Sequence, residues 1–318
     1  MAAEVNVYSA RKEQLIKPLL DRFTEETGIK VNLVTAKADT LIKRLEIEGR
    51  NSPADVLITV DVARLLRTKN EGLFQTLESE LLSDTIPAQY RDPENTWFGL
   101  SLRSRVIVYS PDRVDVNNLS SYENLVEANW QGRICIRSSS NVYNQSLVAS
   151  LVANNGEAAT AEWAKGMVKN FAREPKGGDR DQIKAVVAGV CDIAVVNTYY
   201  LGAMLESDQE DQSNIAKQVK LFWPNQSDRG THMNVSGAGV LSAAPNKESA
   251  IKLVEFLVSD ESQAWYAKIN HEYPVKSGIT ISDTLTSWGE FKADPLSLDE
   301  LGKNNKPAVL LMDRAGWK

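Results

Sequence analysis

Three tyrosines are the side chains whose types and positions in this sequence most directly suggest chemistry. Tyr199 and Tyr200 are adjacent and follow a strand-like run at residues 192–196, where two large phenols are not needed to fill a core. Tyr143 lies in the first turn of a predicted helix that follows another strand-like run. A tyrosine at a strand end usually only packs against its neighbours, so the pair alone leaves that explanation open. With Tyr143 facing the pair, three phenols would meet at one point.

Three converging phenols would suit a ferric ion. A phenol has a pKa of about 10, and only a strong local positive charge makes its phenolate favourable at neutral pH. Fe(III) is a hard cation that prefers anionic oxygen, and three phenolates balance its charge, which leaves positions for a small bidentate anion or water. Zinc would need His or Cys, and calcium or magnesium would need carboxylates and carbonyls; neither set follows the predicted strands.

Other polar residues at predicted strand ends suit an anion. The run at residues 138–143, Ser-Ser-Ser-Asn-Val-Tyr, leads into a helix, where free backbone N–H groups and the helix dipole attract negative charge. Ser139 or Ser140 could equally be helix caps only. Arg103 has a forked guanidinium that would hold a carboxylate, carbonate or phosphate, although a structural salt bridge explains many arginines equally well.

The elements that position these residues alternate between strand and helix patterns. Strand patterns at residues 5–8, 29–34 and 56–60 are separated by two amphipathic helices that end near Gly28 and Gly49. This βαβαβ order predicts a parallel sheet. A second α/β series starts after Trp97, with a strand pattern at residues 106–109 that places the run Arg103-Ser104-Arg105 outside a strand.

The later part of the chain is predicted to return to the first lobe. A strand pattern at residues 235–241 precedes two helices, so the chain would cross between lobes twice and form a hinge. We therefore predict an α/β fold of two Rossmann-like lobes. The first lobe is expected to comprise residues 1–101 and 235–285, and the second, which carries the tyrosines, residues 102–234 and 286–318.

Composition narrows the functional classes. The 318 residues exceed the usual single domain of about 100–150 residues, which favours two lobes. The sequence lacks an apolar run near the roughly 20 residues of a membrane helix, so we expect no membrane span. A net charge of −6 argues against nucleic-acid binding. Cys135 and Cys191 have no Cys-x-x-Cys spacing, which excludes a thiolate cluster and leaves open a disulfide or two buried thiols.

Several motifs are spread over essentially the whole chain. They are Val7-Tyr8-Ser9 with Arg11, Thr-Gly-Ile-Lys-Val at residues 27–31, Ser-Pro-Ala-Asp-Val at 52–56, Arg-Ser-Arg-Val at 103–106, Asn-Thr-Tyr-Tyr at 197–200, and Tyr273-Pro274. In these motifs the chain resembles the bacterial periplasmic ferric-ion-binding proteins, the receptors of iron-uptake ABC transporters, which have the type II periplasmic binding-protein fold.

The resemblance implies a ligand set. Tyr143, Tyr199 and Tyr200 would bind the iron. The accompanying anion, expected to be carbonate or bicarbonate, would be bound by Arg103, Ser139, Ser140, Asn141 and Asn197. Arg11 is a further candidate to bind the anion from the first lobe.

The first lobe departs from part of the family. Many relatives supply a His or a Glu from that lobe, but the corresponding positions here are Lys12 and Val60, so the resemblance is to the subgroup that uses tyrosines and carbonate. Tyr8 is expected to line the site rather than bind iron. Asp61 is a candidate to orient a water or an arginine.

The expected function is that of a monomeric periplasmic binding protein that closes over Fe(III) and its synergistic anion and delivers them to an inner-membrane ABC permease. The export signal missing from this sequence is expected to have been removed. The alternative is a receptor for a small organic or inorganic anion that uses the same cleft without metal. An enzyme is disfavoured because His232 and His271 fall outside the strand-end loops, which leaves poor material for a Ser-His-acid triad.

Overall fold

The computed structural model describes residues 3–318 and divides them into two compact units. Unit 1 extends to Leu102 and also contains Asn234–Ile281 and Ser297–Asp299. Unit 2 contains Arg103–Met233, Ser282–Leu296 and Glu300–Lys318. We propose that these units are the two lobes expected from the sequence.

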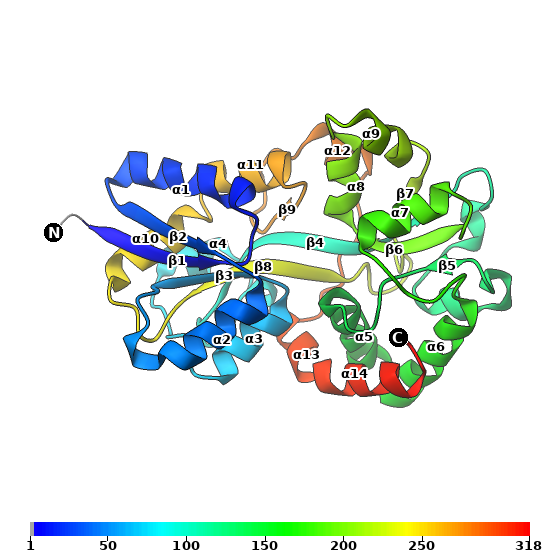
Figure 1. Ribbon diagram of the computed structural model, residues 1–318, viewed down its shortest axis with the longest axis horizontal. Helices are drawn as coiled ribbons and strands as arrows, with labels where there is room; N and C mark the ends of the chain where they lie inside the picture. The colour runs from blue at the N-terminus through cyan, green and yellow to red at the C-terminus, as the bar shows by residue number, and fades with distance from the viewer. Residues whose placement is uncertain (1–2) are drawn as a thin grey trace. The chain divides into compact units, whose positions relative to one another are not determined.

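Unit 1 is built on the predicted βαβαβ pattern. Strand β1 (Glu4–Ser9) pairs in parallel with β2 (Lys30–Thr35) and β3 (Val56–Val60), and β3 pairs antiparallel with β8 (Met233–Val240). Helix α1 buries four apolar residues against this sheet and ends at Gly28, whose φ of 71° is left-handed and therefore favours glycine. The helices of this unit and its short strand are α1 (Glu13–Thr27), α2 (Ala38–Glu48), α3 (Val62–Asn70), α4 (Glu80–Thr85), α10 (Lys247–Phe256), α11 (Asp260–Ile269) and β9 (Tyr273–Pro274) (Figure 1).

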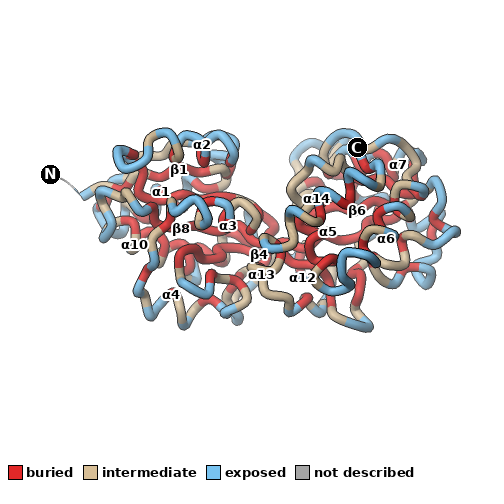
Figure 2. The backbone as a smooth tube through the Cα atoms, turned by 90° about the horizontal axis from the view of Figure 1, so that it is seen from below, coloured by how far each residue is buried: buried red, intermediate tan, exposed pale blue. Residues whose placement is uncertain are grey.

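Unit 2 has a smaller mixed sheet. Strand β6 (Ile193–Asn197) pairs antiparallel with β4 (Phe98–Tyr109) and parallel with β5 (Ile134–Cys135), and β7 (Lys220–Phe222) pairs with the end of β4. The helices are α5 (Val142–Asn155), α6 (Glu157–Asn170), α7 (Asp179–Val187), α8 (Thr198–Leu205), α9 (Glu210–Ala216), α12 (Asp283–Ser287), α13 (Leu298–Lys303) and α14 (Asn305–Arg314) (Figure 1). Buried residues, drawn in red in Figure 2, run along the strands of both units.

Strand β4 is longer than the sequence pattern indicated. It starts at Phe98, and all twelve of its residues are buried, so Arg103-Ser104-Arg105 lies inside the strand and not in the expected loop. The prediction was wrong because charged residues are rarely buried unless they are paired. Here Arg105 is paired with Asp179 and two asparagines, and the Ser104 hydroxyl donates to the carbonyl of His232.

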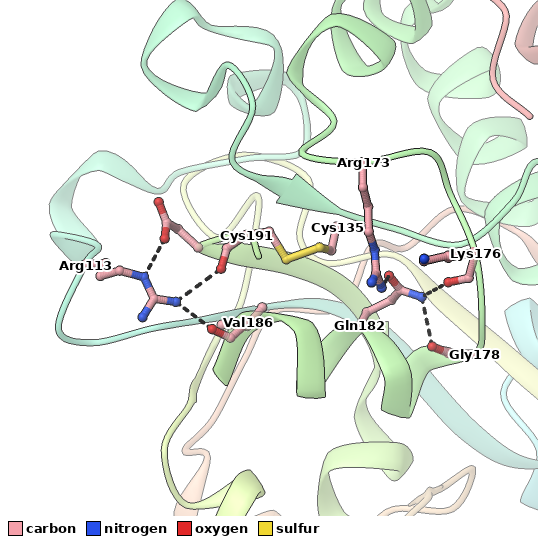
Figure 3. The surroundings of a disulfide bond; sticks show 9 residues. Arg113, Cys135, Arg173, Lys176, Gly178, Gln182, Val186 and Cys191 are labelled. Carbon is pink, nitrogen blue, oxygen red and sulfur yellow. Dashed lines mark hydrogen bonds and ion pairs between the residues drawn. A yellow bond between two sulfur atoms is a disulfide. The ribbon is translucent and has the colours of Figure 1, made fainter. Parts of the chain in front are cut away.

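The two cysteines form a disulfide. It joins β5 at Cys135 to Cys191, which lies just before β6, and both residues are buried (Figure 3). The Arg113 guanidinium donates to the carbonyls of Val186 and Cys191 and so ties the end of α7 to the same region. Of the two states that the sequence left open, the structure contains the disulfide, a bond that persists in oxidising compartments.

Across residues 3–318, no helix has both the length and the apolar character required to cross a lipid bilayer.

Candidate metal centre

The structure brings the three tyrosines together at two helix N-termini of unit 2. Tyr143 is the second residue of α5, and Tyr199 is the second residue of α8. Their phenol oxygens lie 3.1 Å apart. The ring of Tyr200 packs on that of Tyr199 with centroids 4.4 Å apart. All three are half-buried, so the three rings form one cluster that remains partly open to solvent.

Two phenols of this cluster, those of Tyr143 and Tyr199, have raised pKa values. Burial raises the pKa of Tyr143 to about 12, the neighbouring Tyr200 adds to the rise, and Arg103 opposes it. Burial and the charges of the two other phenols also raise the pKa of Tyr199. The neutral forms of Tyr143 and Tyr199 are therefore favoured, and a highly charged cation in contact with their oxygens would be needed to make the phenolates favourable.

Each ring of the cluster has an arginine beside it. The guanidinium carbon lies 5.5–5.9 Å from the ring centroid in three pairs: Arg137 with Tyr143, Arg103 with Tyr199, and Arg180 with Tyr200. This is the range of a cation–π contact. Arg137 and Arg180 were not singled out from the sequence, and their positions just after β5 and at the start of α7 are the signals that could have found them. The arginines supply positive charge that a bound anion would neutralise.

Arg103 and Asn197, two residues predicted to bind the anion, lie next to the tyrosines. Arg103 is 2% exposed within β4 and reaches the ring of Tyr199. Asn197 is the last residue of β6, and its side-chain amide lies 3.5 Å from the Tyr199 hydroxyl. Its carbonyl oxygen accepts a hydrogen bond from Arg105.

The serine-rich loop has more internal hydrogen bonds than we expected. Asn141, and neither serine, caps α5, because its side chain accepts from the Tyr143 N–H. The N–H of Ser139 donates to the Lys318 carbonyl, and the N–H of Ser140 donates to the Ser138 hydroxyl. The backbone N–H groups of both serines are thus engaged within the protein. The roles of Ser139, Ser140 and Asn141 toward an anion stay predictions.

Arg11 belongs to unit 1 and has partners there. One of its guanidinium nitrogens lies 2.7 Å from both the Glu272 carboxylate and the Ser101 hydroxyl, and all three side chains are buried. The contact of Arg11 with an anion stays a prediction.

The other first-lobe candidates also have structural partners. The Tyr8 hydroxyl donates to Glu48 at 3.0 Å. The carboxylate of Asp61 caps α3 by accepting from the Ala63 N–H, and it accepts a second bond from the Asn234 amide. Lys12 precedes α1 and is exposed.

Within the part of the chain that the structure describes, three or more His, Cys, Asp or Glu residues do not gather in a way that could hold a metal ion. The tyrosine cluster is therefore the candidate metal centre, and its metal donors would be phenol oxygens.

Comparison with known proteins identifies the family of the chain. Residues 51–292 match the family model described as bacterial extracellular solute-binding protein. The chain is 52% identical over 315 residues to iron uptake protein A1 of Synechocystis, covering 99% of this chain and 88% of that protein. It is 32% identical to the Fe(3+)-binding periplasmic protein of Serratia marcescens, covering 98% and 89%.

Solved structures agree over the full length. The Trichodesmium protein (IdiA, FutA) in complex with iron and citrate ligands superposes with a TM-score of 0.97 at 49% identity, covering 99% of this chain and 100% of that one. The ferric binding protein of Campylobacter jejuni gives 0.94 at 39% identity, with the same coverage. The predicted resemblance is confirmed, and so is the α/β fold class of two Rossmann-like lobes in type II periplasmic binding-protein architecture.

Proposed function

Because the chain belongs to the bacterial extracellular solute-binding proteins, we propose that it is a periplasmic receptor that captures ferric iron and delivers it to an ABC transporter permease. This family binds and carries its solute, so the expectation that the chain is not an enzyme is confirmed. Relatives named for iron uptake and for Fe(3+) binding, at up to 52% identity, support iron as the cargo.

One observation carries the ferric assignment, namely the convergence of three phenols. The hydroxyls of Tyr143 and Tyr199 are 3.1 Å apart, and Tyr200 packs on Tyr199. Three phenols that lose their protons to a trivalent ion form a neutral unit with it, whereas a divalent ion would leave an excess negative charge. Capture therefore exchanges three O–H protons for one Fe(III).

A small anion is proposed to complete the coordination. Arg103, Arg137 and Arg180 lie beside the phenol rings, and although Asp179 already pairs with Arg137, a carbonate or bicarbonate held beside these arginines would accept charge-assisted hydrogen bonds. Citrate is the competing anion, because the Trichodesmium relative was solved with iron and citrate.

The arginines also give a specific reason to consider a second function, the binding of a small anion without metal. Such a receptor needs donors and positive charge, which this unit has. It does not need a cluster of three phenols, because a neutral phenol is a weaker partner for an anion than a guanidinium. Iron with an anion therefore accounts for more of the site than an anion alone.

A titration of the iron-free protein tests the proposal. Ferric iron would be added as a weak chelate in bicarbonate buffer, and visible absorbance would be followed. We expect an intense phenolate-to-iron charge-transfer band that saturates at one iron per chain. Binding of citrate or bicarbonate measured by calorimetry without iron, combined with the absence of the visible band, would instead support the anion receptor.

A further inference from the structure

A buried carboxylate connects the two segments that carry the tyrosines. Asp179 is the first residue of α7 and is fully buried. Its Oδ2 accepts from the backbone N–H of Asn197 at 2.8 Å, two residues before Tyr199. Its Oδ1 lies 3.5 Å from the Arg137 guanidinium, whose carbon is 5.5 Å from the centroid of the Tyr143 ring. The Asp179 side chain therefore contacts both the end of β6, just before Tyr199, and Arg137, which lies beside Tyr143.

A buried arginine extends this connection to helix α5. Arg105 is 1% exposed, and its Nη1 donates to Asp179 Oδ2 at 3.3 Å and to Asn197 Oδ1 at 3.0 Å. Its Nη2 donates to Asn144 Oδ1 at 2.7 Å. Asn144 directly follows Tyr143, so the guanidinium joins the segments of both tyrosines.

Asn144 in turn fixes the serine-rich loop. Its Nδ2 donates to the carbonyls of Arg137 at 2.7 Å and Ser138 at 3.1 Å. Asn144 is fully buried, and both of its polar atoms are used. The loop that enters α5 is therefore tied to the same network as the end of β6.

Burying these charges costs free energy unless they are partnered, and a hydrophobic replacement of similar volume often stabilises a protein at least as well. Stability alone therefore does not explain the network. Its members meet where the tyrosine segments meet, and ligand geometry needs such support from the residues behind the ligands.

We propose that Asp179 and Asn144 are positioning residues that set the spacing of Tyr143 from Tyr199 and Tyr200. This inference rests on the proposed function, because the spacing matters only if the phenols share a ligand. Neither residue is proposed to touch the iron.

Asp192 provides a matched control. Its carboxylate also lies between two arginines of unit 2, with Arg113 and Arg133 each 2.6 Å away. It precedes β6, at the opposite end of that strand from Asn197. Asp192→Asn therefore makes the same chemical change beside two arginines, at a carboxylate that is partly exposed and lies away from the tyrosine segments.

The test compares wild type, Asp179→Asn and Asp192→Asn by ferric titration, visible absorbance and thermal unfolding. We expect Asp179→Asn to weaken ferric affinity about 10- to 100-fold and to shift the charge-transfer band. Asp192→Asn should stay within about twofold of wild type in affinity, with an unchanged band, even if both variants lose similar thermal stability.

Asn144→Asp keeps the test decisive if Asp179→Asn does not fold. It preserves the shape and the acceptor for Arg105 but removes the donor to the Arg137 and Ser138 carbonyls, and it should also weaken affinity about tenfold or more. If Asp179→Asn folds and keeps the ferric affinity and the charge-transfer band of wild type, the positioning role is overturned. If only Asn144→Asp folds, the same result in that variant overturns it. A wild-type protein without the visible band would overturn the proposed function itself, and the inference with it.

Discussion

The hydroxyl of Tyr199 lies 3.1 Å from that of Tyr143, although 56 positions separate the two residues and each belongs to a different helix. Both occupy the second position of a helix that directly follows a strand end or its loop. A shared position at two neighbouring strand ends is what allows distant parts of the chain to present phenols to one ligand.

Removing one hydroxyl from the cluster should abolish tight iron binding. Tyr199→Phe preserves the ring that packs on Tyr200 but deletes an oxygen donor and the negative charge that it would supply. We expect ferric affinity to fall by more than about 100-fold and the visible band to weaken, because the loss of a direct ligand should exceed that of a supporting residue. Isothermal or optical titration measures both.

Tyr109→Phe is the control for that change. Tyr109 is a buried tyrosine of the same unit at the far end of β4. Removing the Tyr109 hydroxyl should leave the ferric affinity and the visible band unchanged. If the two variants bound iron equally well, the phenol of Tyr199 would not be a ligand.

Arg103 should contribute more to the binding of the anion than to the binding of iron. Arg103→Gln removes a buried positive charge beside Tyr199. We expect the gain in ferric affinity on adding bicarbonate to shrink by about 10-fold or more, since a charge-assisted bond to an anion is worth about 1.5–3 kcal/mol. Titrations with and without bicarbonate give this ratio, and an unchanged ratio would remove Arg103 from the anion site.

His232 should make the protein sensitive to acid. Its side chain is buried, and burial together with Arg105 and Arg229 lowers the pKa of His232 to about 3, against about 6.5 when unfolded. The neutral imidazole therefore contributes its full stability above pH 6.5 and loses it progressively as the pH falls toward 3. At pH 5 the loss is about 2 kcal/mol.

Urea unfolding at pH 7 and pH 5 measures this effect. In His232→Gln the difference in unfolding free energy between the two pH values should be smaller by about 2 kcal/mol than in wild type. An identical difference in both proteins would show that His232 does not titrate in this way.

The disulfide should stabilise unit 2 by lowering the conformational entropy of the unfolded chain. Cys135 and Cys191 are 56 residues apart, and closing a loop of that length is worth about 4 kcal/mol in the chain-entropy model. We expect the double variant Cys135→Ser/Cys191→Ser to lose about this much unfolding free energy, and a reducing agent to destabilise wild type but not the variant. Equal sensitivity of both proteins to the reducing agent would contradict this.

The sequence was most informative where local pattern determines structure. Alternating apolar runs and Gly28 predicted the parallel β1–β3 arrangement, and the strand-end positions of Tyr143 and Tyr199 indicated their proximity. One feature of the fold could not be predicted from the local sequence pattern. The continuation of β4 through Arg103-Ser104-Arg105 depends on distant partners, and one of these is Asp179, a carboxylate that no local pattern distinguishes from a solvated one.

The disulfide and the caps illustrate the same limit. Spacing alone could not decide between a bond and two thiols, because the distance between Cys135 and Cys191 depends on the pairing of β5 with β6. Asn141 caps α5, while the hydroxyls of Ser138 and Ser140 hydrogen-bond to each other.

Resonance Raman spectroscopy of the iron-loaded protein tests the central claim most directly. Excitation within the visible band enhances the vibrations of groups bonded to the metal. We predict enhanced phenolate ring modes in wild type that weaken when Tyr143, Tyr199 or Tyr200 is changed to Phe, one at a time. An iron-loaded protein without phenolate modes, or with modes indifferent to all three substitutions, would contradict the assignment of these tyrosines as the ferric ligands.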